Sequence, residues 1–336
     1  MNLSYDKMVQ LASAGLQAGG IGEKAAFETA QFLALAELDG LASHGLARVS
    51  QYAGHAKNGR VELAPKIKVR PFKTCAALVD ACDGLAFPAL RFATDLSVNL
   101  ASKSGVGLVA VTNSHHFGVA GHFAEAAARA GYISLLFGNT PAAMPMVGGS
   151  KALFGTNPLA AAFPIANRDP LVIDMSLSAV ARGKLLLAAK KGESIPEGWA
   201  LTIDGKPTTD PKEGLKGLMV PLGGDKGALL ALMIELLVVG LSGSRFSYEA
   251  DSFFDAKGNR PRIGQLLLTI DPGLAGSQVF ASKMQGFLKI LAADAGTRVP
   301  GQRRFKQRAR GFKEGVNVSD VVVEEIQTGI RQSWNG

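Results

Sequence analysis

Three residues near the N-terminus have the side chains and the spacing of a small acid–base centre. Ser43 and His44 are adjacent, and Arg48 follows four positions later. The imidazole of histidine exchanges a proton near neutral pH, and arginine grips a carboxylate through two hydrogen bonds. A helix over residues 43–57 would place His44 and Arg48 on one face. The pattern predicts protonation of a carbonyl or imine beside a bound carboxylate; the alternative is an ordinary helix start capped by Ser43.

A second polar segment, residues 112–122, follows a predicted strand and opens a predicted helix. It contains His115, His116 and His122 among small residues. Backbone amides at a helix N-terminus bind phosphate and other anions, so the segment predicts an anion-binding turn. Because His115 and His122 are seven positions apart, a metal site on one helix face is an alternative. No cluster of cysteines or carboxylates completes a metal shell there, and a plain polar turn is the other alternative.

Three further turns carry side chains that suit a ligand. Thr156 offers a hydroxyl in a Gly-Thr-Asn-Pro turn, and Asp174 ends a buried strand, where it can accept from a ribose hydroxyl. Residues 223–227, Gly-Gly-Asp-Lys-Gly, precede a long apolar helix and suit a phosphate. The alternative is a simple turn for the segment of Thr156, a helix N-cap for Asp174, and a flexible turn with a solvated lysine for residues 223–227. The Gly-x-Gly-x-x-Gly dinucleotide fingerprint is absent from the sequence.

The elements that position these residues alternate between strands and helices. Two amphipathic helices are expected within residues 3–40, with a glycine-rich break at 19–22. Residues 191–221 are rich in Gly, Pro, Asp and Lys and predict a long excursion or lid, and 242–264 is expected to be another long loop. Strands are expected at 67–70, 75–80, 107–112, 133–137, 159–163, 171–174 and 266–270, and further helices at 89–104, up to 130, 179–190, 226–241 and 281–293. This alternation indicates an α/β fold.

Composition excludes several classes of protein. The chain has 336 residues, of which 47% are hydrophobic, enough for a large core. Its net charge of +8 is dispersed apart from one basic run at 303–310, so nucleic-acid binding is not expected, and a non-catalytic basic binding protein is the less favoured alternative. The longest apolar run, 228–241, is too short to span a bilayer. Two cysteines do not make a disulfide framework, and we expect a cytoplasmic protein without a metal or a membrane partner.

In their order and spacing, the motifs resemble those of the malate/L-lactate dehydrogenase family, whose members lack a Rossmann domain. The resemblance extends from residues 43–45 to 300–301. Besides the segments above, it includes Ile-Pro-Glu-Gly-Trp at 195–199 and Asp-Gly-Lys-Pro-Thr-Thr-Asp-Pro at 204–211. The family includes ureidoglycolate and sulfolactate dehydrogenases and reductases of Δ1-piperideine-2-carboxylate and Δ1-pyrroline-2-carboxylate.

The resemblance implies a non-Rossmann NAD(P)-binding mixed sheet flanked by helices, with an N-terminal helical region. It implies a helical region at 1–62 with the Ser-His-Gly motif, linking strands and a helix at 63–104, an NAD(P)-binding α/β domain at 105–285, and a C-terminal segment at 286–336 that contributes to the cofactor site. NADPH is the expected cofactor, with NADH as the alternative. The expected assembly is a homodimer whose active site lies near subunit and domain boundaries.

The resemblance also assigns roles to single residues. It implies that His44 is the acid–base, that Ser43 is its partner and that Arg48 holds the substrate carboxylate. The other residues implied to bind substrate are Thr156, Arg182 and Gly183. The residues implied to bind the cofactor are His116, Phe117, Gly118, Val119, Ala120, Asp174, Met175, Ser176, Asp225, Lys226, Arg303 and Arg304.

The implied activity is NAD(P)H-dependent reduction of a small cyclic 2-imino acid, Δ1-piperideine-2-carboxylate or Δ1-pyrroline-2-carboxylate, at C2. The alternative is a 2-hydroxy acid dehydrogenase of the malate, lactate or ureidoglycolate type. Arg182-Gly183 is similar to the imino acid reductases. Those reductases are expected to carry an acidic relay residue immediately after this glycine, where this chain has Lys184.

Overall fold

The centre of the molecule is a seven-stranded mixed sheet. The computed structural model describes residues 1–276 and 279–334. The strand order is β2-β3-β4-β13-β5-β8-β9; β3 and β4 are parallel, and the other neighbours are antiparallel. The strands are β2 (Lys68–Lys73), β3 (Ala76–Asp80), β4 (Val106–Ser114), β13 (Ile263–Ile270), β5 (Ile133–Gly138), β8 (Leu159–Phe163) and β9 (Leu171–Met175). The predicted α/β mixed sheet is confirmed.

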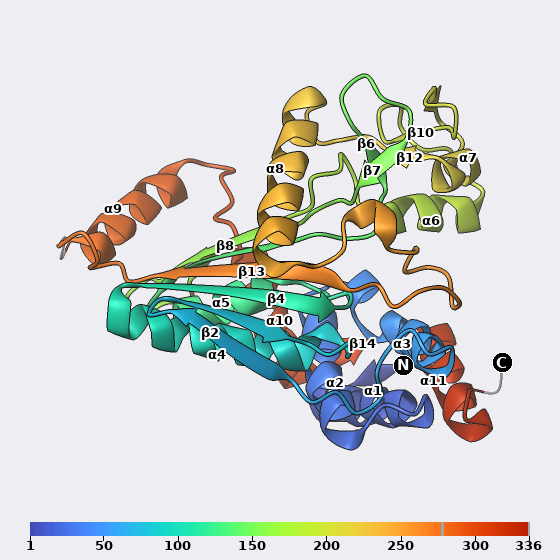
Figure 1. Cartoon of the computed structure of the whole chain (residues 1–336), viewed down its shortest axis with the longest axis horizontal. Helices are drawn as coiled ribbons and strands as arrows, with labels where there is room; N and C mark the ends of the chain where they lie inside the picture. Colours follow the sequence, from blue (N-terminus) through green and yellow to red (C-terminus); the bar gives the residue numbers. More distant parts are fainter. Residues whose placement is uncertain (277–278, 335–336) are drawn as a thin grey trace.

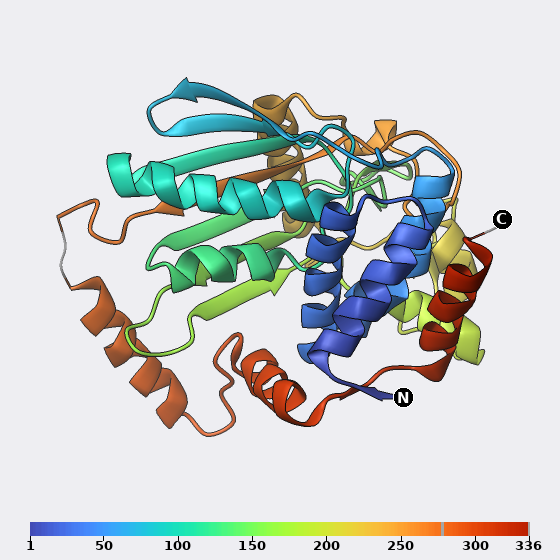
Figure 2. The same cartoon turned by 90° about the horizontal axis from the view of Figure 1, so that it is seen from below.

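Helices cover one face of this sheet and continue beyond its end (Figure 1). α4 (Ala86–Ser104) and α5 (Ala120–Arg129) pack directly on the strands, and Figure 2 shows both lying over the sheet and running roughly along its strands. Beside them lies a helical bundle of α1 (Tyr5–Ala18), α2 (Glu23–Leu38), α3 (Val49–Lys57), α10 (Gln302–Glu314) and α11 (Asp320–Gln332). The chain ends meet here, because β1 (Asn2–Leu3) pairs with β14 (Val316–Asn317). One core cluster joins the bundle to the sheet.

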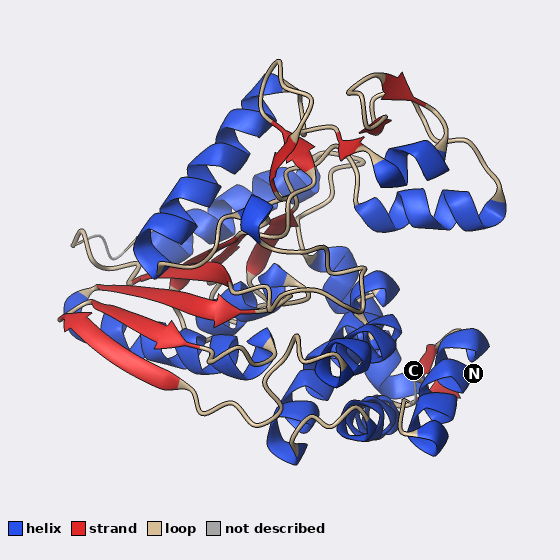
Figure 3. Cartoon of the chain, turned by 45° about the vertical axis from the view of Figure 1, so that its right-hand side comes forward, coloured by secondary structure: helices blue, strands red, loops and turns tan. Residues whose placement is uncertain are grey.

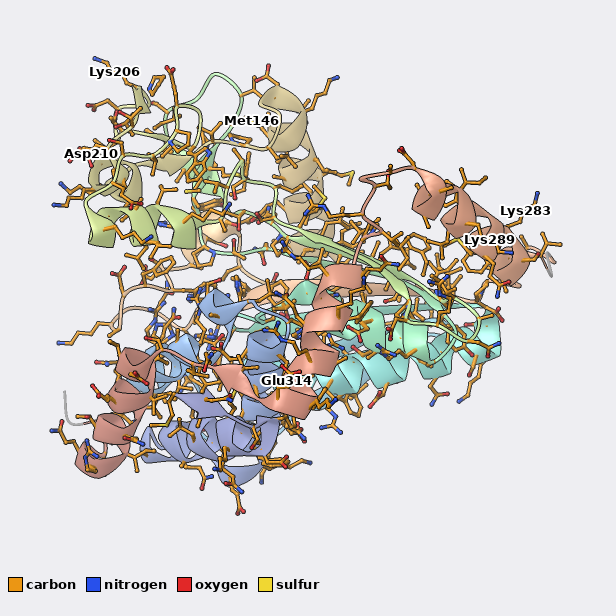
Figure 4. All side chains as sticks on the ribbon, turned by 180° about the vertical axis from the view of Figure 1, so that it is seen from behind. Met146, Lys206, Asp210, Lys283, Lys289 and Glu314 are labelled. Carbon is orange, nitrogen blue, oxygen red and sulfur yellow. The ribbon has the colours of Figure 1, made fainter. Side chains whose placement is uncertain are left out.

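The opposite face carries α8 (Asp225–Ser242) and a small lobe with a separate core cluster (Figure 3). The lobe is built from β6 (Met144–Pro145), β7 (Ala152–Phe154), α6 (Arg182–Lys191), β10 (Ala200–Leu201), β11 (Pro207–Thr208), α7 (Pro211–Lys216) and β12 (Leu218–Met219). The predicted excursion at 191–221 is therefore a folded part of this lobe. Lys206 and Asp210 lie at its outer edge (Figure 4).

The helix α9 (Phe280–Ala293) projects from the body of the molecule (Figure 1). Leu288 is the residue of this helix that is buried. Lys283 and Lys289 extend from it (Figure 4). Across the described residues, no helix is both long enough and apolar enough to cross a membrane.

Candidate active site

Ser43, His44 and Arg48 do come together, but on a different backbone from the predicted one. The expected helix over 43–57 is wrong at its start: two 3-10 turns, η1 (Ala42–His44) and η2 (Leu46–Arg48), precede α3. Ser43 is not a helix cap, because its Oγ lies 3.0 Å from His44 Nδ1. Arg48 Nε donates to the backbone oxygen of Ser43 at 2.7 Å, which brings the guanidinium back toward the histidine. This contact is the one that we expect if Ser43 orients the ring of His44.

A buried carboxylate fixes the bend between these two turns. Glu37 Oε1 accepts a hydrogen bond from the Leu46 amide at 2.8 Å. A Cβ added at Gly45 would lie 2.2 Å from the same oxygen, so only glycine fits beside it. Burial raises the pKa of the Glu37 carboxyl. The sequence gives no signal for this role of Glu37, because glutamate is also common on exposed helix faces.

A second histidine stacks on the first. The rings of His44 and His116 have their centroids 5.7 Å apart, with 23° between their planes. The hydroxyl of Tyr52, a residue that the sequence reasoning missed, lies 2.5 Å from His116 Nδ1. Burial, with the positive charge of Arg48, lowers the pKa of His44 to about 4. Burial also lowers the pKa of His116, so neither ring carries a charge near neutral pH.

His115 and His122 do not form the metal site considered above. His115 precedes α5 and contacts His55, with 3.0 Å between His115 Nε2 and His55 Nδ1. His122 lies within α5, and its Nε2 is 2.8 Å from Asp39 Oδ2. The metal hypothesis is therefore wrong for this pair, because each ring has its own partner.

The small lobe contributes a second arginine to the same region. Gly183 lies against Ser43, since a Cβ added at Gly183 would be 3.7 Å from the Ser43 Cβ. The guanidinium of Arg182 lies 5.2 Å from the ring centroid of Phe254, and that of Arg48 lies 5.8 Å from the same centroid. Lys184 turns elsewhere, with its Nζ 5.5 Å from the ring centroid of Trp199. The site thus contains two arginines and one aromatic ring beside the Ser-His pair.

Two of the predicted cofactor segments meet at the start of α5. The Gly121 amide donates to Asp174 Oδ2 at 2.8 Å, which joins the turn after His116 to the end of β9. Arg304 Nη1 lies 3.7 Å from the same oxygen. Burial raises the pKa of Asp174. Phe117, Val119 and Ala120 are buried, whereas His116 and Gly118 (φ +66°) are half-buried.

Backbone hydrogen bonds join three more predicted segments. The Leu177 amide donates to the Thr156 oxygen at 2.8 Å, and the Leu222 amide donates to the Leu177 oxygen at 2.8 Å. The Gly-Thr-Asn-Pro turn, the segment of Met175 and Ser176, and the glycine-rich turn before α8 are therefore neighbours. Asp225 and Lys226 begin α8 and are exposed.

The basic run at 303–310 does not form an exposed patch along its whole length. Arg308 bonds Asp39 and Glu125 at 2.6–2.9 Å. Arg304 lies 3.5 Å from Asp39 Oδ2 and 3.9 Å from Glu125 Oε2. Although burial alone would raise the pKa of Asp39, the hydrogen bonds from Arg308 and His122 hold it below its ordinary value. Arg303 remains exposed.

Comparison with known proteins identifies this arrangement. A family model described as malate/L-lactate dehydrogenase matches residues 3–327. The chain belongs to the malate/L-lactate dehydrogenase family. A (2R)-3-sulfolactate dehydrogenase (NADP(+)) of Chromohalobacter salexigens is 46% identical to it over 97% of both chains. A Δ1-pyrroline-2-carboxylate/Δ1-piperideine-2-carboxylate reductase of Pseudomonas putida is 37% identical, covering 97% of this chain and 95% of the relative.

A solved structure of the family supports the same fold. The Δ1-piperideine-2-carboxylate reductase of Pseudomonas syringae pv. tomato superposes with a TM-score of 0.92 at 34% identity, covering 98% of this chain and 99% of the other. The predicted family is confirmed, and the chain is an oxidoreductase of the malate/L-lactate dehydrogenase family. The named substrates of its relatives are small carboxylates of two kinds, hydroxy acids and cyclic imines.

Proposed function

We propose that the protein is an NADP(H)-dependent dehydrogenase. It interconverts a 2-hydroxy acid that bears a second anionic group, such as 3-sulfolactate, and the corresponding 2-oxo acid. The observation that carries the proposal is the pair Arg48 and Arg182, which both reach the ring of Phe254 beside the Ser-His pair. Neither arginine takes part in an ion pair among the described residues. Two unpaired guanidiniums suit a dianion. The 46% identical relative is named for such a substrate.

Each residue of the centre has a distinct task in this proposal. Because His44 Nδ1 faces Ser43 Oγ, its Nε2 is the nitrogen that exchanges a proton with the oxygen on C2. Arg48 holds the carboxylate next to C2 through its free N–H groups, and Arg182 holds the second anion. In the reductive direction His44 donates its proton as C2 is reduced, and in the oxidative direction it accepts that proton.

The cofactor would lie along the segments that meet at α5 and α8. NADPH supplies the hydride that reduces C2, and NADP(H) is favoured by the name of the 46% identical relative. Gly223 and Gly224 have left-handed backbones with nothing within 4 Å of their added Cβ atoms, and α8 has no side-chain cap at its start. This open helix N-terminus, with exposed Lys226 in its first turn, fits a phosphate-bearing group. Arg303, exposed at the start of α10, is a separate candidate for a phosphate contact. Asp174 and Ser176 would line the same site.

A cyclic 2-imino acid is the second candidate substrate. The 37% identical relative and the structure at TM-score 0.92 are named for this activity. Lys184 argues against it, because this side chain stands where an acidic relay residue is expected and turns to Trp199. Hence the oxo acid is preferred.

A substrate panel tests the proposal. Wild-type protein would be assayed with NADPH and with NADH against 3-sulfopyruvate, oxaloacetate, pyruvate and Δ1-piperideine-2-carboxylate. We expect the highest kcat/KM with NADPH and a dianionic oxo acid. Arg182→Met should lower kcat/KM for the dianions by about 10- to 1000-fold and change that for pyruvate much less. Preferred reduction of the imine, with no substrate-dependent effect of Arg182→Met, would refute the proposal.

The acid–base assignment has its own test. His44→Ala should abolish turnover while NADPH still binds, which fluorescence titration of the bound nucleotide measures. Because the ring of His116 stacks on that of His44, His116→Ala is the matched comparison. Turnover that survives His44→Ala and disappears in His116→Ala would move the proton transfer to His116.

We also propose that the protein forms a homodimer through the outer face of α8. The exposed side chains of this helix recur at helical spacing, and the face includes Gly240, which has open space around it. The apolar members are Leu229, Met233, Leu236, Leu237 and Leu241. A stripe of this kind along one helix is typical of an interface, and a second copy offers the matching surface.

A further inference from the structure

The loop of residues 243–262, which joins α8 to β13, reaches the candidate site with two adjacent phenylalanines. Phe253 is buried, and its ring lies 5.2 Å from that of His115 and 5.3 Å from that of His116. Phe254 is 51% exposed and contacts the guanidiniums of both site arginines. The ring of Phe253 therefore anchors the loop to His115 and His116, and the ring of Phe254 contacts the two arginines.

We propose that Phe254 is a specificity-determining residue, which holds Arg48 and Arg182 together and makes the site selective for ligands with two anionic groups. The inference rests on the proposed function for its choice of substrate. It extends that function, because neither the sequence motifs nor the family resemblance assigns a role to this position.

The electrostatics of the ring explain the selectivity. Two guanidiniums at one site repel each other, and an aromatic face attracts cations. Both guanidinium carbons lie within 6 Å of the ring centroid, the range in which this attraction operates. A guanidinium that contacts a ring keeps N–H groups free for a carboxylate or a sulfonate. The ring thus offsets the repulsion between the arginines before the ligand binds.

The backbone that carries Phe254 is held from two sides. Arg60, which is 0% exposed, donates to the backbone oxygens of this loop. Its acceptors are Asp251 at 3.1 Å, Ser252 at 3.0 Å, Asn259 at 2.9 Å and also Asp255. On the other side, Gln51 donates to the oxygen of Phe253 and accepts from Arg48 Nη1 at 2.6 Å. The loop is therefore preorganised, and Gln51 couples it directly to one of the two arginines.

The test compares three substitutions at exposed positions. Phe254→Leu keeps an apolar side chain without the π-face, Phe254→Tyr keeps the face, and Tyr248→Leu is the control on the same loop. Tyr248 is 60% exposed and stacks on Phe246, with no contact to either arginine. The dissociation constants of malonate and sulfoacetate, each against acetate, would be measured by calorimetry. The KM and kcat for 3-sulfopyruvate and pyruvate would be measured with NADPH.

We expect Phe254→Leu to weaken binding of the dianions by about 5- to 30-fold, the sum of two cation–π contacts of ordinary strength. The KM for 3-sulfopyruvate should rise by a similar factor with kcat nearly unchanged, and acetate and pyruvate should change less. Phe254→Tyr and Tyr248→Leu should both keep the wild-type dissociation constants and KM values. Equal effects on monoanions and dianions, or a tyrosine variant that behaves like leucine, would overturn the inference.

The binding measurements keep this inference separate from the proposed function. If the wild type reduces none of the oxo acids but binds malonate and sulfoacetate selectively, and Phe254→Leu weakens that binding, the proposed function fails and the role of Phe254 stands. If the wild type reduces 3-sulfopyruvate but Phe254→Leu binds dianions as before, the function stands and the inference fails.

Discussion

Titrating the ring of His44 tests the link between the packing of the site and its chemistry. Burial, with the positive charge of Arg48, lowers the pKa of this histidine to about 4, whereas an unperturbed histidine titrates near 6.5. At pH 6.5 the difference leaves about one His44 ring in 300 protonated, instead of one in two. The neutral ring that predominates is the form required to accept a proton from a hydroxy acid.

The direction of the pH dependence follows from this. For oxidation, kcat/KM needs neutral His44, so it should be flat between pH 5 and 8 and should fall only as the pH drops through about 4. For reduction, kcat/KM needs protonated His44, so it should fall about tenfold per pH unit above that value. An unperturbed histidine would instead place the break of the oxidation profile near pH 6.5.

NMR titration and the pH profile of oxidation both check the pKa of His44. The ring signals of 13C-labelled histidine would be followed by NMR against pH, with His44→Gln to assign the signal of His44. Arg48→Met should raise the midpoint, because it removes a positive charge that disfavours protonation. A His44 midpoint near 6.5 in the wild type, or an oxidation profile that breaks between pH 6 and 7, would refute the reasoning.

The remaining predictions concern stability and assembly. Gly45→Ala should lower the free energy of unfolding by about 1–3 kcal/mol in urea titrations, because its Cβ would collide with Glu37; unchanged unfolding would contradict that packing. Asp39→Asn should cost about 3–5 kcal/mol by leaving Arg308 incompletely paired. The wild type should lose stability as the pH falls below the ordinary aspartate range, since the folded state lowers the pKa of Asp39; acid unfolding of the two proteins measures both effects. Met233→Asp should convert a dimer to a monomer in light scattering, and an unchanged mass would place the interface elsewhere.

The helices and strands that bury apolar side chains were predictable from the sequence. The strands of the central sheet and the helices α1, α2, α4 and α8 follow from hydrophobic periodicity. The two C-terminal helices were not predicted. In α10 the buried residues are Phe305 and Gly311, and Arg304 and Arg308 turn inward to carboxylates. A helix that buries charged side chains in ion pairs has little apolar periodicity to detect.

The ordered motifs predicted the main members of the site, but the residues that position them could not be found in this way. Tyr52 and Glu37 act through contacts with residues far along the chain or across a bend. Arg60 binds backbone oxygens, and every residue in the chain has one, so no spacing of residue types identifies its partners. The 3-10 turns around Gly45 depend on a single close approach to Glu37, which is a tertiary contact.

The partners of the arginines separate structural from ligand-binding roles. Arg308 is hydrogen-bonded to two carboxylates, and Arg60 is satisfied by backbone oxygens of one loop. Arg48 and Arg182 instead contact neutral groups and an aromatic ring, and burial lowers the pKa of both. A positive charge withdrawn from water without a counter-charge is costly, so an anionic ligand that restores the balance binds more tightly than it would to exposed arginines. We therefore expect these two charges, placed beside a neutral histidine, to favour ligands with two negative groups and a proton-exchanging oxygen between them.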